Sequence, residues 1–305
     1  MGFGLGLIEG DDAGSMPFRE EGFGETPQKG PHLTVVTKPR SPTHWPEYFI
    51  EATALGAFMI SAAVFAALLY YPGSPIAARL SNAWIRRAFM GFAMGLTAVL
   101  IIYSPWGQRS GAHMNPSVTL TYFRLGKVRP RDLAGYLIAQ FTGGILGLAA
   151  VTMALYGLVS DPSVNFVKTV PGRHGESFAF LGEFAISFAL MLTVLHVSNH
   201  PRFSRWTGVC AGLLVWAYIT FEAPLSGMSM NPARTLGSAL VARDFPGLWI
   251  YFSAPPLGMF LAAEFFTRRF GLQHIVCAKL HHPHSGPCIF GCARSLGHIE
   301  PIGTP

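Results

Sequence analysis

Charged side chains are scarce in this sequence: Asp, Glu, Lys and Arg make up 12% of the 305 residues, whereas about 25% is usual for a soluble domain. A further 50% of the residues are apolar or aromatic. Because a water-soluble chain of this length needs more charge to cover its surface, we expect much of the exterior to face lipid. The net charge of +6 is not arranged as a basic stripe with interleaved aromatic residues, so nothing indicates a nucleic-acid partner.

Cysteine is equally sparse, with four residues in the chain. Cys210 lies within an apolar segment, whereas Cys277, Cys288 and Cys292 follow the last such segment. No two of them have a spacing that indicates a disulfide, and the C-terminal thiols face a reducing cytoplasm if both termini lie inside. We therefore predict no structural disulfide.

Histidines accompany the C-terminal cysteines, and imidazole and thiolate groups are suitable ligands for zinc or copper. The side chains that could serve as such ligands are His281, His282, His284, Cys288 and Cys292. Their spacing matches no standard zinc finger, and the Gly, Pro and Ser residues around them are typical of an unstructured end. We therefore predict a flexible tail over 271–305, with no metal and no cofactor.

Six apolar windows of about 20 residues are long enough to cross a hydrocarbon core of about 30 Å as helices. They lie at approximately 48–71, 85–104, 132–158, 178–198, 206–223 and 248–268. None shows the alternation of apolar and polar residues that a membrane-spanning strand requires. The sequence therefore predicts an all-α membrane protein with six transmembrane helices.

Residues 1–46 mix charges of both signs with many Gly and Pro residues, and they contain no apolar run long enough for a secretory signal. We predict a disordered N-terminal tail that begins in the cytoplasm, followed by a folded body over 47–270. With this orientation most of the 22 Lys and Arg residues fall on the cytoplasmic side, in agreement with the positive-inside rule. Arg79, Arg86 and Arg87 weaken that contrast. We expect a multi-pass protein of the plasma (inner) membrane with both termini cytoplasmic.

Two near-copies of one ten-residue segment, GAHMNPSVTL and GMSMNPARTL, begin at Gly111 and Gly227. They follow the second and the fifth predicted spans, which indicates duplication of a three-span unit, over about 47–158 and 177–270. Since an odd number of spans lies between the copies, the second unit is inverted relative to the first. Inverted repeats place their shared site near the middle of the membrane.

Each copy contains an Asn-Pro pair that predicts the start of a helix, at Asn115-Pro116 and at Asn231-Pro232. A helix of about ten residues covers about 15 Å, or half a bilayer. We therefore predict two re-entrant half-helices that enter from opposite faces and bring their N-termini together at the midplane. Each N-terminus carries about half a positive charge, so protons and metal cations are repelled, whereas a neutral solute can hydrogen-bond to the Asn amides and pass.

These two motifs, the GAH that precedes the first, and an acid early in the first span of each unit resemble the major intrinsic proteins, the aquaporin and glycerol-facilitator family, in a bacterial-type form. The resemblance covers about 45–270. It implies a homotetramer of six-span pores in the lipid bilayer, each conducting water and small neutral solutes in single file.

The resemblance also implies roles for particular residues. Asn115 and Asn231 resemble the midplane donors, and Arg234 resembles the arginine of the outer constriction. Glu51 and Glu183 resemble the buried acids that hold the re-entrant loops, with His113 before the first motif. The half-helix starts are Pro116, Ser117, Pro232 and Ala233.

Several positions depart from the family pattern. Ser117 stands where Ala is usual. Counting back from Arg234 places Met228 before the second motif and Ile219 or Thr220 where water-specific pores often carry His. Met94 or Gly95 falls where an aromatic side chain commonly narrows water pores. The remaining filter candidates are therefore Met228, Ile219, Thr220, Met94 and Gly95.

Such a filter is wider and more apolar than in strict water channels, which leaves room for glycerol or another small neutral solute. Thr235, Ala239 and the pair Tyr251-Phe252 favour water instead, because glycerol facilitators have an acid, a basic residue and a different pair there. We therefore predict a water channel, with a glycerol or small-solute facilitator as the alternative. An enzyme is not predicted, because no nucleophile and base are paired at membrane depth. A non-conducting structural or adhesion protein is the other alternative.

Overall fold

The computed structural model describes residues 43–282, 288–290 and 292, and these residues form helices and connecting loops without a strand. Six helices are long: α1 Trp45–Tyr70, α3 Ala83–Tyr103, α6 Pro130–Ala154, α8 Glu176–Asn199, α9 Thr207–Phe221 and α12 Leu248–Phe270. The others are α2 Pro75–Arg79, α4 Pro105–Ser110, α5 Pro116–Arg124, α7 Tyr156–Val159, α10 Ala223–Ser226, α11 Pro232–Ala242, and the 3-10 turns η1 Asn165–Val167, η2 Ser204–Trp206 and η3 Leu272–His274. Nearly all of the predicted N-terminal tail, 1–46, lies outside the described residues.

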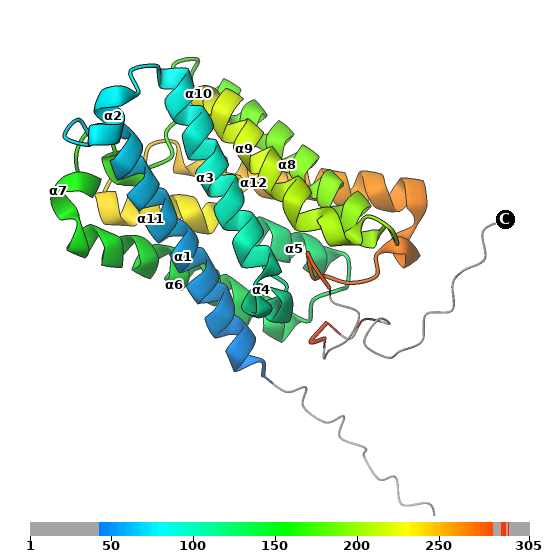
Figure 1. Cartoon of the computed structure of the whole chain (residues 1–305). Helices are drawn as coiled ribbons and strands as arrows, with labels where there is room; N and C mark the ends of the chain where they lie inside the picture. Colours follow the sequence, from blue (N-terminus) through cyan, green and yellow to red (C-terminus); the bar gives the residue numbers. More distant parts are fainter. Residues whose placement is uncertain (1–42, 283–287, 291, 293–305) are drawn as a thin grey trace, which may run out of the picture. The chain divides into compact units, whose positions relative to one another are not determined.

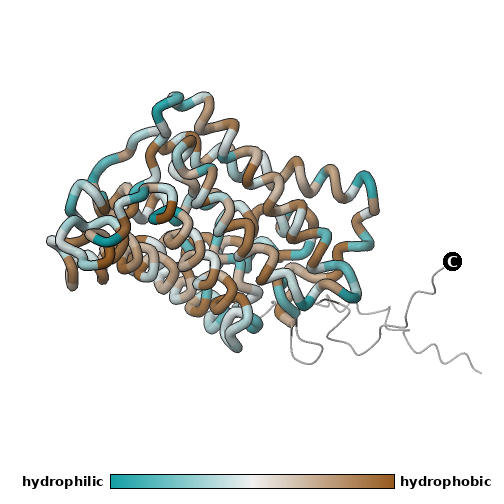
Figure 2. The backbone as a smooth tube through the Cα atoms, turned by 45° about the horizontal axis from the view of Figure 1, so that its top comes forward, coloured by the Kyte–Doolittle hydropathy of each residue, from teal (hydrophilic) through white to brown (hydrophobic). Residues whose placement is uncertain are grey.

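The six long helices lie at the six predicted positions (Figure 1), so the all-α prediction is confirmed. Four of them, α1, α3, α6 and α8, are long and apolar enough to span a membrane by length and composition alone. α9 has 15 residues, and α12 carries Glu264, Arg268 and Arg269 in its last turns. Figure 2 shows apolar residues along the helices and hydrophilic ones mainly at the connections between them.

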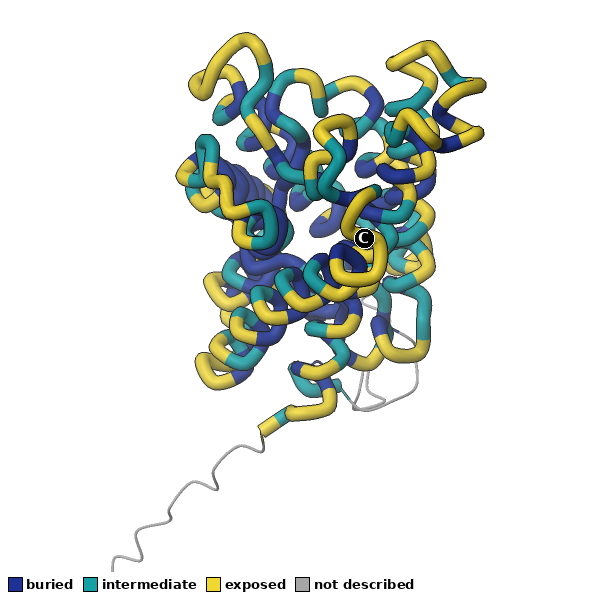
Figure 3. The backbone as a smooth tube through the Cα atoms, turned by 90° about the vertical axis from the view of Figure 1, so that its left-hand side faces the viewer, coloured by how far each residue is buried: buried dark blue, intermediate teal, exposed yellow. Residues whose placement is uncertain are grey.

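The helices pack as the duplicated unit requires. α1 packs along α6 in the first unit, α8 packs along α12 in the second, and α3 and α9 pack against each other between the units. Buried residues face the interior of this bundle, and exposed ones lie on its outside (Figure 3). Large apolar side chains such as Phe92, Leu100 and Ile138 are exposed there, as expected for a surface that faces lipid.

Glycines bring the paired helices close together. A Cβ atom added to Gly147 on α6 would lie 2.5 Å from the Cα of Gly56 on α1, and one on Gly258 of α12 would lie 2.4 Å from a backbone oxygen of α8. Gly95 of α3 and Gly212 of α9 make the same kind of contact, with a Cβ on Gly95 only 2.4 Å from the oxygen of Gly212. Small residues thus set the distance between membrane helices here.

The half-helices α5 and α11 have 9 and 11 residues and begin at Pro116 and Pro232, as predicted. α5 packs against α6 and α12, and α11 packs against α6. Both lie inside the ring of long helices. We call the face at which α1 begins and α12 ends the terminal face. From the middle of the bundle α5 returns to this face, whereas α11 returns to the opposite face.

The chain does not leave the folded body where α12 ends. Ile275, Cys277, Ala278, Lys279 and Leu280 are all buried. The N–H of Leu280 donates a hydrogen bond to the oxygen of Gly111 at 3.1 Å. This differs from the predicted flexible tail over 271–305: residues 275–282 pack under the terminal face, because the stretch from 275 to 280 is mostly apolar and contacts apolar surface there. The rest of that tail, apart from 288–290 and 292, lies outside the described residues.

Candidate functional site

The two Asn side chains each join their own half-helix to the opposite loop. The Oδ1 of Asn115 accepts from the N–H of Ser117 at 2.9 Å, and its Nδ2 donates to the oxygen of Met230 at 2.7 Å. Asn231 accepts from the N–H groups of Ala233 and Arg234 at 3.0 and 3.2 Å, and it donates to the oxygen of Met114 at 2.7 Å. Each Asn is therefore both a helix cap and a bridge between the repeats.

The loops that lead into the half-helices have matching backbone conformations. Ala112 and Met114 in the first copy, and Met228 and Met230 in the second, have φ values between 48° and 55°. For residues with a side chain this left-handed region costs about 1–3 kcal/mol each, so the surroundings must hold it. Because the same two positions are strained in each copy, the strained conformation is a shared feature of the two re-entrant loops.

Two fully buried carboxylates hold these loops. Glu51 accepts from the N–H groups of His113 and Met114 at 3.0 and 2.7 Å. Glu183 accepts from the N–H groups of Ser229 and Met230 at 2.6 and 2.7 Å. Both acids sit on the first helix of their own unit, so the same arrangement appears twice. The bonds to charged acceptors are the stronger kind and offset the loop strain.

A serine and a tyrosine add further hydrogen bonds around each buried carboxylate. The hydroxyls of Ser110 and Ser226 donate to Glu51 and Glu183 at 2.8 and 2.9 Å. The hydroxyls of Tyr136 and Tyr251 donate to the backbone oxygens of these same serines, each at 2.5 Å. Sequence reasoning did not find this second layer. The Ser-Gly pair at the start of each motif could have indicated the serines, because it occurs in both copies. The tyrosines lie too far from the motifs to be found by aligning the two short segments.

His113 holds more than its loop. Its Nδ1 lies 3.0 Å from the hydroxyl of Thr119 on α5, and its Nε2 donates to the oxygen of Ala278 at 2.8 Å. The ring stacks between Tyr122 and Phe290. His113 therefore joins the first re-entrant loop to the C-terminal segment. The side chain of its counterpart in the second copy, Ser229, bonds only to Asn231 and Thr235, within its own loop and half-helix, among the described residues.

A cavity of about 440 Å³ runs between the half-helices and the long helices. Asn115, Asn231 and Arg234 supply polar groups in it, and apolar side chains make up much of the remaining wall. Tyr70, Arg87, Ser163 and Lys168 line it near the opposite face, and Ile102 and Leu280 line it near the terminal face. The Nη1 of Arg234 is buried and has no hydrogen-bond acceptor among the described residues.

The position of the cavity separates the filter candidates. Met94, Ile219 and Met228 line it. Thr220 is not among its lining residues, and its hydroxyl donates to the oxygen of Trp216 in its own helix at 2.7 Å. Gly95 lies at the contact with Gly212 instead. Among the ambiguous positions, the structure therefore corrects Thr220 and Gly95 and retains Ile219 and Met94.

The half-helix starts lie beside the cavity rather than in its wall. Ser117 and Ala233 are both fully buried. The hydroxyl of Ser117 has no hydrogen-bond partner among the described residues, and a Cβ on Gly144 of α6 would lie 2.9 Å from the oxygen of Ala233. These small residues let the half-helices pack closely against the long ones.

Comparison with known sequences identifies the family. The sequence model described as "Major intrinsic protein" matches residues 40–266. The chain belongs to the major intrinsic protein family. It is thus an integral, multi-pass membrane protein, and the fold-class prediction agrees.

Two plant proteins are among the relatives within the family. The chain is 37% identical over 166 residues to Aquaporin NIP1-3 of Oryza sativa subsp. japonica, which covers 54% of this chain and 56% of the relative. It is 36% identical over 170 residues to a Probable aquaporin NIP-type of Nicotiana alata, covering 55% and 61%. The matched part thus spans little more than half the length of these curated relatives.

Among solved structures, this major intrinsic protein is similar to the aquaglyceroporin from Plasmodium falciparum, with a TM-score of 0.62 and 21% sequence identity. The similarity covers 73% of this chain and 95% of that one. At this identity the likeness concerns the fold alone. It agrees with the half-helices and the inverted repeat described above.

Proposed function

We propose that this member of the major intrinsic protein family is a passive transmembrane channel for water. The observation that carries the proposal is the pair of Asn side chains, each of which caps one half-helix and lines the same cavity. An amide group has two N–H donors, and one in each Asn already bonds the opposite loop. The second donor of each is available to a solute that passes in single file.

The electrostatics of the site favour a neutral solute. The N-termini of α5 and α11 each carry about half a positive charge, and Arg234 lies on the first turn of α11. A proton or metal cation at this point meets positive potential from three sources. Water instead can accept from the Asn amides and from the buried Nη1 of Arg234.

A small-solute facilitator is the second candidate, and the cavity wall favours it at one place. Met94, Ile219 and Met228 line the cavity. By the resemblance above, strict water channels carry an aromatic side chain and a His in this region, which make the pore narrower and more polar. An apolar wall opposite Arg234 suits the carbon backbone of glycerol while its hydroxyls bond the polar side. Water is the first solute of the proposal, and glycerol is the alternative.

The experiment is osmotic: vesicles containing the purified protein are exposed to an impermeant osmolyte for water flow, and to glycerol for solute flow. We expect faster water flow than in empty vesicles. Glycerol entry should also exceed that of empty vesicles only if the filter is wide enough to admit glycerol. Arg234→Val should raise glycerol entry relative to water, because it removes the charged side of the constriction. Protein-containing vesicles that respond no faster than empty ones would leave the non-conducting structural or adhesion role as the better account.

Assembly and location complete the proposal. By family resemblance the protein is a homotetramer in the plasma (inner) membrane, with both termini cytoplasmic, which makes the terminal face the cytoplasmic one. The exposed apolar side chains on the outer helices support burial against lipid or neighbouring subunits. Cross-linking in native membranes distinguishes tetramers from monomers, and protease access to a tag at either end reports the side on which the termini lie.

A further inference from the structure

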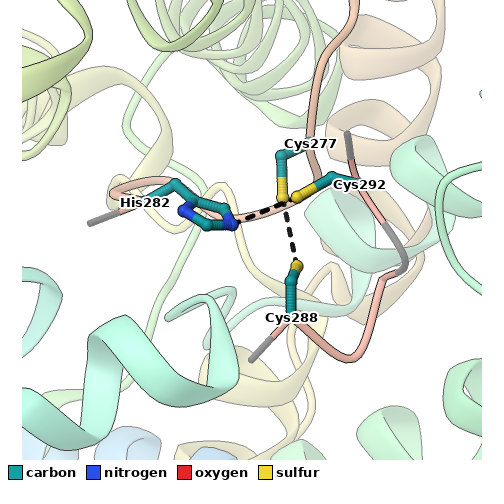
Figure 4. A group of neighbouring side chains, drawn as sticks. All are labelled: Cys277, His282, Cys288 and Cys292. Carbon is teal, nitrogen blue, oxygen red and sulfur yellow. Dashed lines mark hydrogen bonds between the residues drawn. The ribbon is translucent and has the colours of Figure 1, made fainter. Parts of the chain in front are cut away.

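Four side chains near the C-terminus converge under the terminal face. They are Cys277, His282, Cys288 and Cys292 (Figure 4), and their ligand atoms all lie within 4.8 Å of one another. The Sγ atoms of Cys277 and Cys288 are 3.5 Å apart, and the Sγ of Cys292 lies 3.1 Å from the Nε2 of His282. Residues separated by up to 15 positions therefore present one imidazole and three thiols to a common centre.

We propose that Cys277, His282, Cys288 and Cys292 bind one zinc ion, and that the bound ion holds residues 277–282 across the terminal-face end of the pore. The metal site stands on these four side chains alone. The effect on conduction rests in addition on the proposed channel function.

The donor set fits a structural zinc site. Three Cys and one His are among the usual tetrahedral zinc ligands, and ligand atoms at about 2.0–2.3 Å from the ion lie about 3.3–3.8 Å from one another. The two distances given above are in this range or a few tenths of an ångström below it. Hard cations such as Mg²⁺ and Ca²⁺ require oxygen ligands, which this group lacks. Four protein ligands leave no open position, so the ion would stabilise structure rather than perform chemistry.

Burial supports the same conclusion. Cys277 and Cys292 are 4% and 5% exposed, and His282 is 8% exposed, whereas Cys288 is half-buried. A buried set of soft ligands favours a soft or borderline cation. Cys277 was absent from the ligands suggested by the sequence, because it lies apart from the histidines and its position depends on how the segment after α12 folds.

A disulfide accounts for the group less well. None of the four cysteines forms a disulfide, and the 3.5 Å between the Sγ atoms of Cys277 and Cys288 is far longer than a bond of about 2.05 Å. One disulfide among three cysteines leaves a thiol and the imidazole of His282 unused. On the proposed topology the group also faces the reducing cytoplasm, where structural disulfides are rare.

The segment that carries two of the ligands is tied to the pore itself. Leu280, between Cys277 and His282, lines the cavity and is nearly fully buried. Its N–H bonds the oxygen of Gly111, and the oxygen of Ala278 accepts from His113 at 2.8 Å. The contacts therefore lead from the ligand cluster to the first re-entrant loop within a few residues.

Residues 275–282 form no helix or strand, so no regular ladder of backbone hydrogen bonds holds this segment in place. A metal cross-link from this segment to Cys288 and Cys292 would make it more rigid. With the ion bound, Leu280 stays in the terminal-face end of the cavity and obstructs it. With the ion removed, the segment loosens, Leu280 leaves the cavity more often, and conduction rises.

The first test measures metal in the purified full-length protein after zinc loading and removal of free ion. We expect about one zinc per chain, and a thiolate-to-metal absorption band when cobalt replaces zinc. The double variant Cys277→Ser/Cys292→Ser should lose both signals, and Cys288→Ser, at the least buried ligand, should weaken them if the double variant fails to fold. Cys210→Ser, whose thiol lies in α9, is the matched control and should retain them.

The site would be overturned by wild-type protein without bound metal, by equal metal content in wild type and in the double variant, or by an intramolecular disulfide found by mass spectrometry of protein purified under reducing conditions. Metal that dissociates on simple dialysis would identify an adventitious ion only, and would overturn it as well.

The second test measures water flow into vesicles with zinc and with a chelator. Chelation should raise the permeability of the wild type several-fold, and Leu280→Ala should raise it with zinc still bound. Permeability that is above the empty-vesicle level but insensitive to both changes would overturn the obstruction by Leu280. No conduction in any variant would instead overturn the channel function, and the zinc content would still report on the metal site independently.

Discussion

Asn231 donates a hydrogen bond from its side-chain amide to the backbone oxygen of Met114 at 2.7 Å. This bond crosses from the second repeat to the first, because Met114 belongs to the loop that leads into α5. Asn115 makes the reciprocal bond to Met230. The side chains that line the cavity therefore also fix the position of the two half-helices relative to each other. A change at either Asn should affect both the structure and the passage of solutes.

The buried carboxylates can be tested by removing their charge. Glu183→Gln keeps the size of the side chain but presents an N–H toward loop donors that need an acceptor. Leaving such a donor unsatisfied costs about 1–3 kcal/mol, so we expect a lower unfolding temperature and reduced water flow. Glu264→Gln is the control, since Glu264 pairs with Arg124 and Arg268 at the surface, where such pairs contribute about 0–1 kcal/mol. Equal effects of the two substitutions would contradict the role of Glu183.

The close contact of α1 and α6 predicts a steric effect at Gly147. In Gly147→Ala the new Cβ would lie 2.5 Å from the Cα of Gly56, so the helices must move apart, at a cost of about 1–3 kcal/mol. Gly157→Ala is the control, because no atom lies within 4 Å of the added Cβ. Thermal unfolding in detergent compares the two. A Gly147→Ala protein as stable as Gly157→Ala would show that this contact can relax without loss.

The filter assignment predicts different results at two adjacent positions. Ile219 lines the cavity, so Ile219→His should narrow the passage and lower glycerol entry more than water flow. Thr220 bonds its own helix and does not line the cavity, so Thr220→Val should leave the ratio of the two flows unchanged. Paired measurements on the same vesicle preparations give that ratio directly. A change at Thr220 with none at Ile219 would reverse the assignment.

The sequence predicted the elements whose signals are local. A span is a run of apolar residues, and a half-helix start is an Asn-Pro pair, so both can be identified without knowledge of the fold. The inverted repeat followed from counting spans. The same reasoning could not choose between Ile219 and Thr220, or between Met94 and Gly95, because neighbouring residues on a helix differ by about 100° in direction and only packing fixes which one faces the cavity.

The C-terminal segment was the least predictable part. Its composition resembles that of an unstructured end, and the spacing of its cysteines and histidines matches no standard metal site. Cys277 joins the cluster only because the chain after α12 packs beneath Gly111, which is a contact between residues far apart in sequence. Long-range contacts of this kind leave no periodic or local pattern to read.

The central claim is that solutes pass the paired Asn side chains. Stopped-flow light scattering of vesicles that contain equal amounts of wild type, Asn231→Asp or Cys210→Ser tests it most directly. Asn231→Asp loses the bond to Met114 and places a carboxylate at the midplane. Leaving the Met114 oxygen without its donor costs about 1–3 kcal/mol. A rise of about 1.4 kcal/mol in the barrier to passage is a factor of ten in rate, so we predict about a tenfold fall in water permeability, with Cys210→Ser unchanged. Wild-type permeability in the Asn231→Asp vesicles would contradict the account.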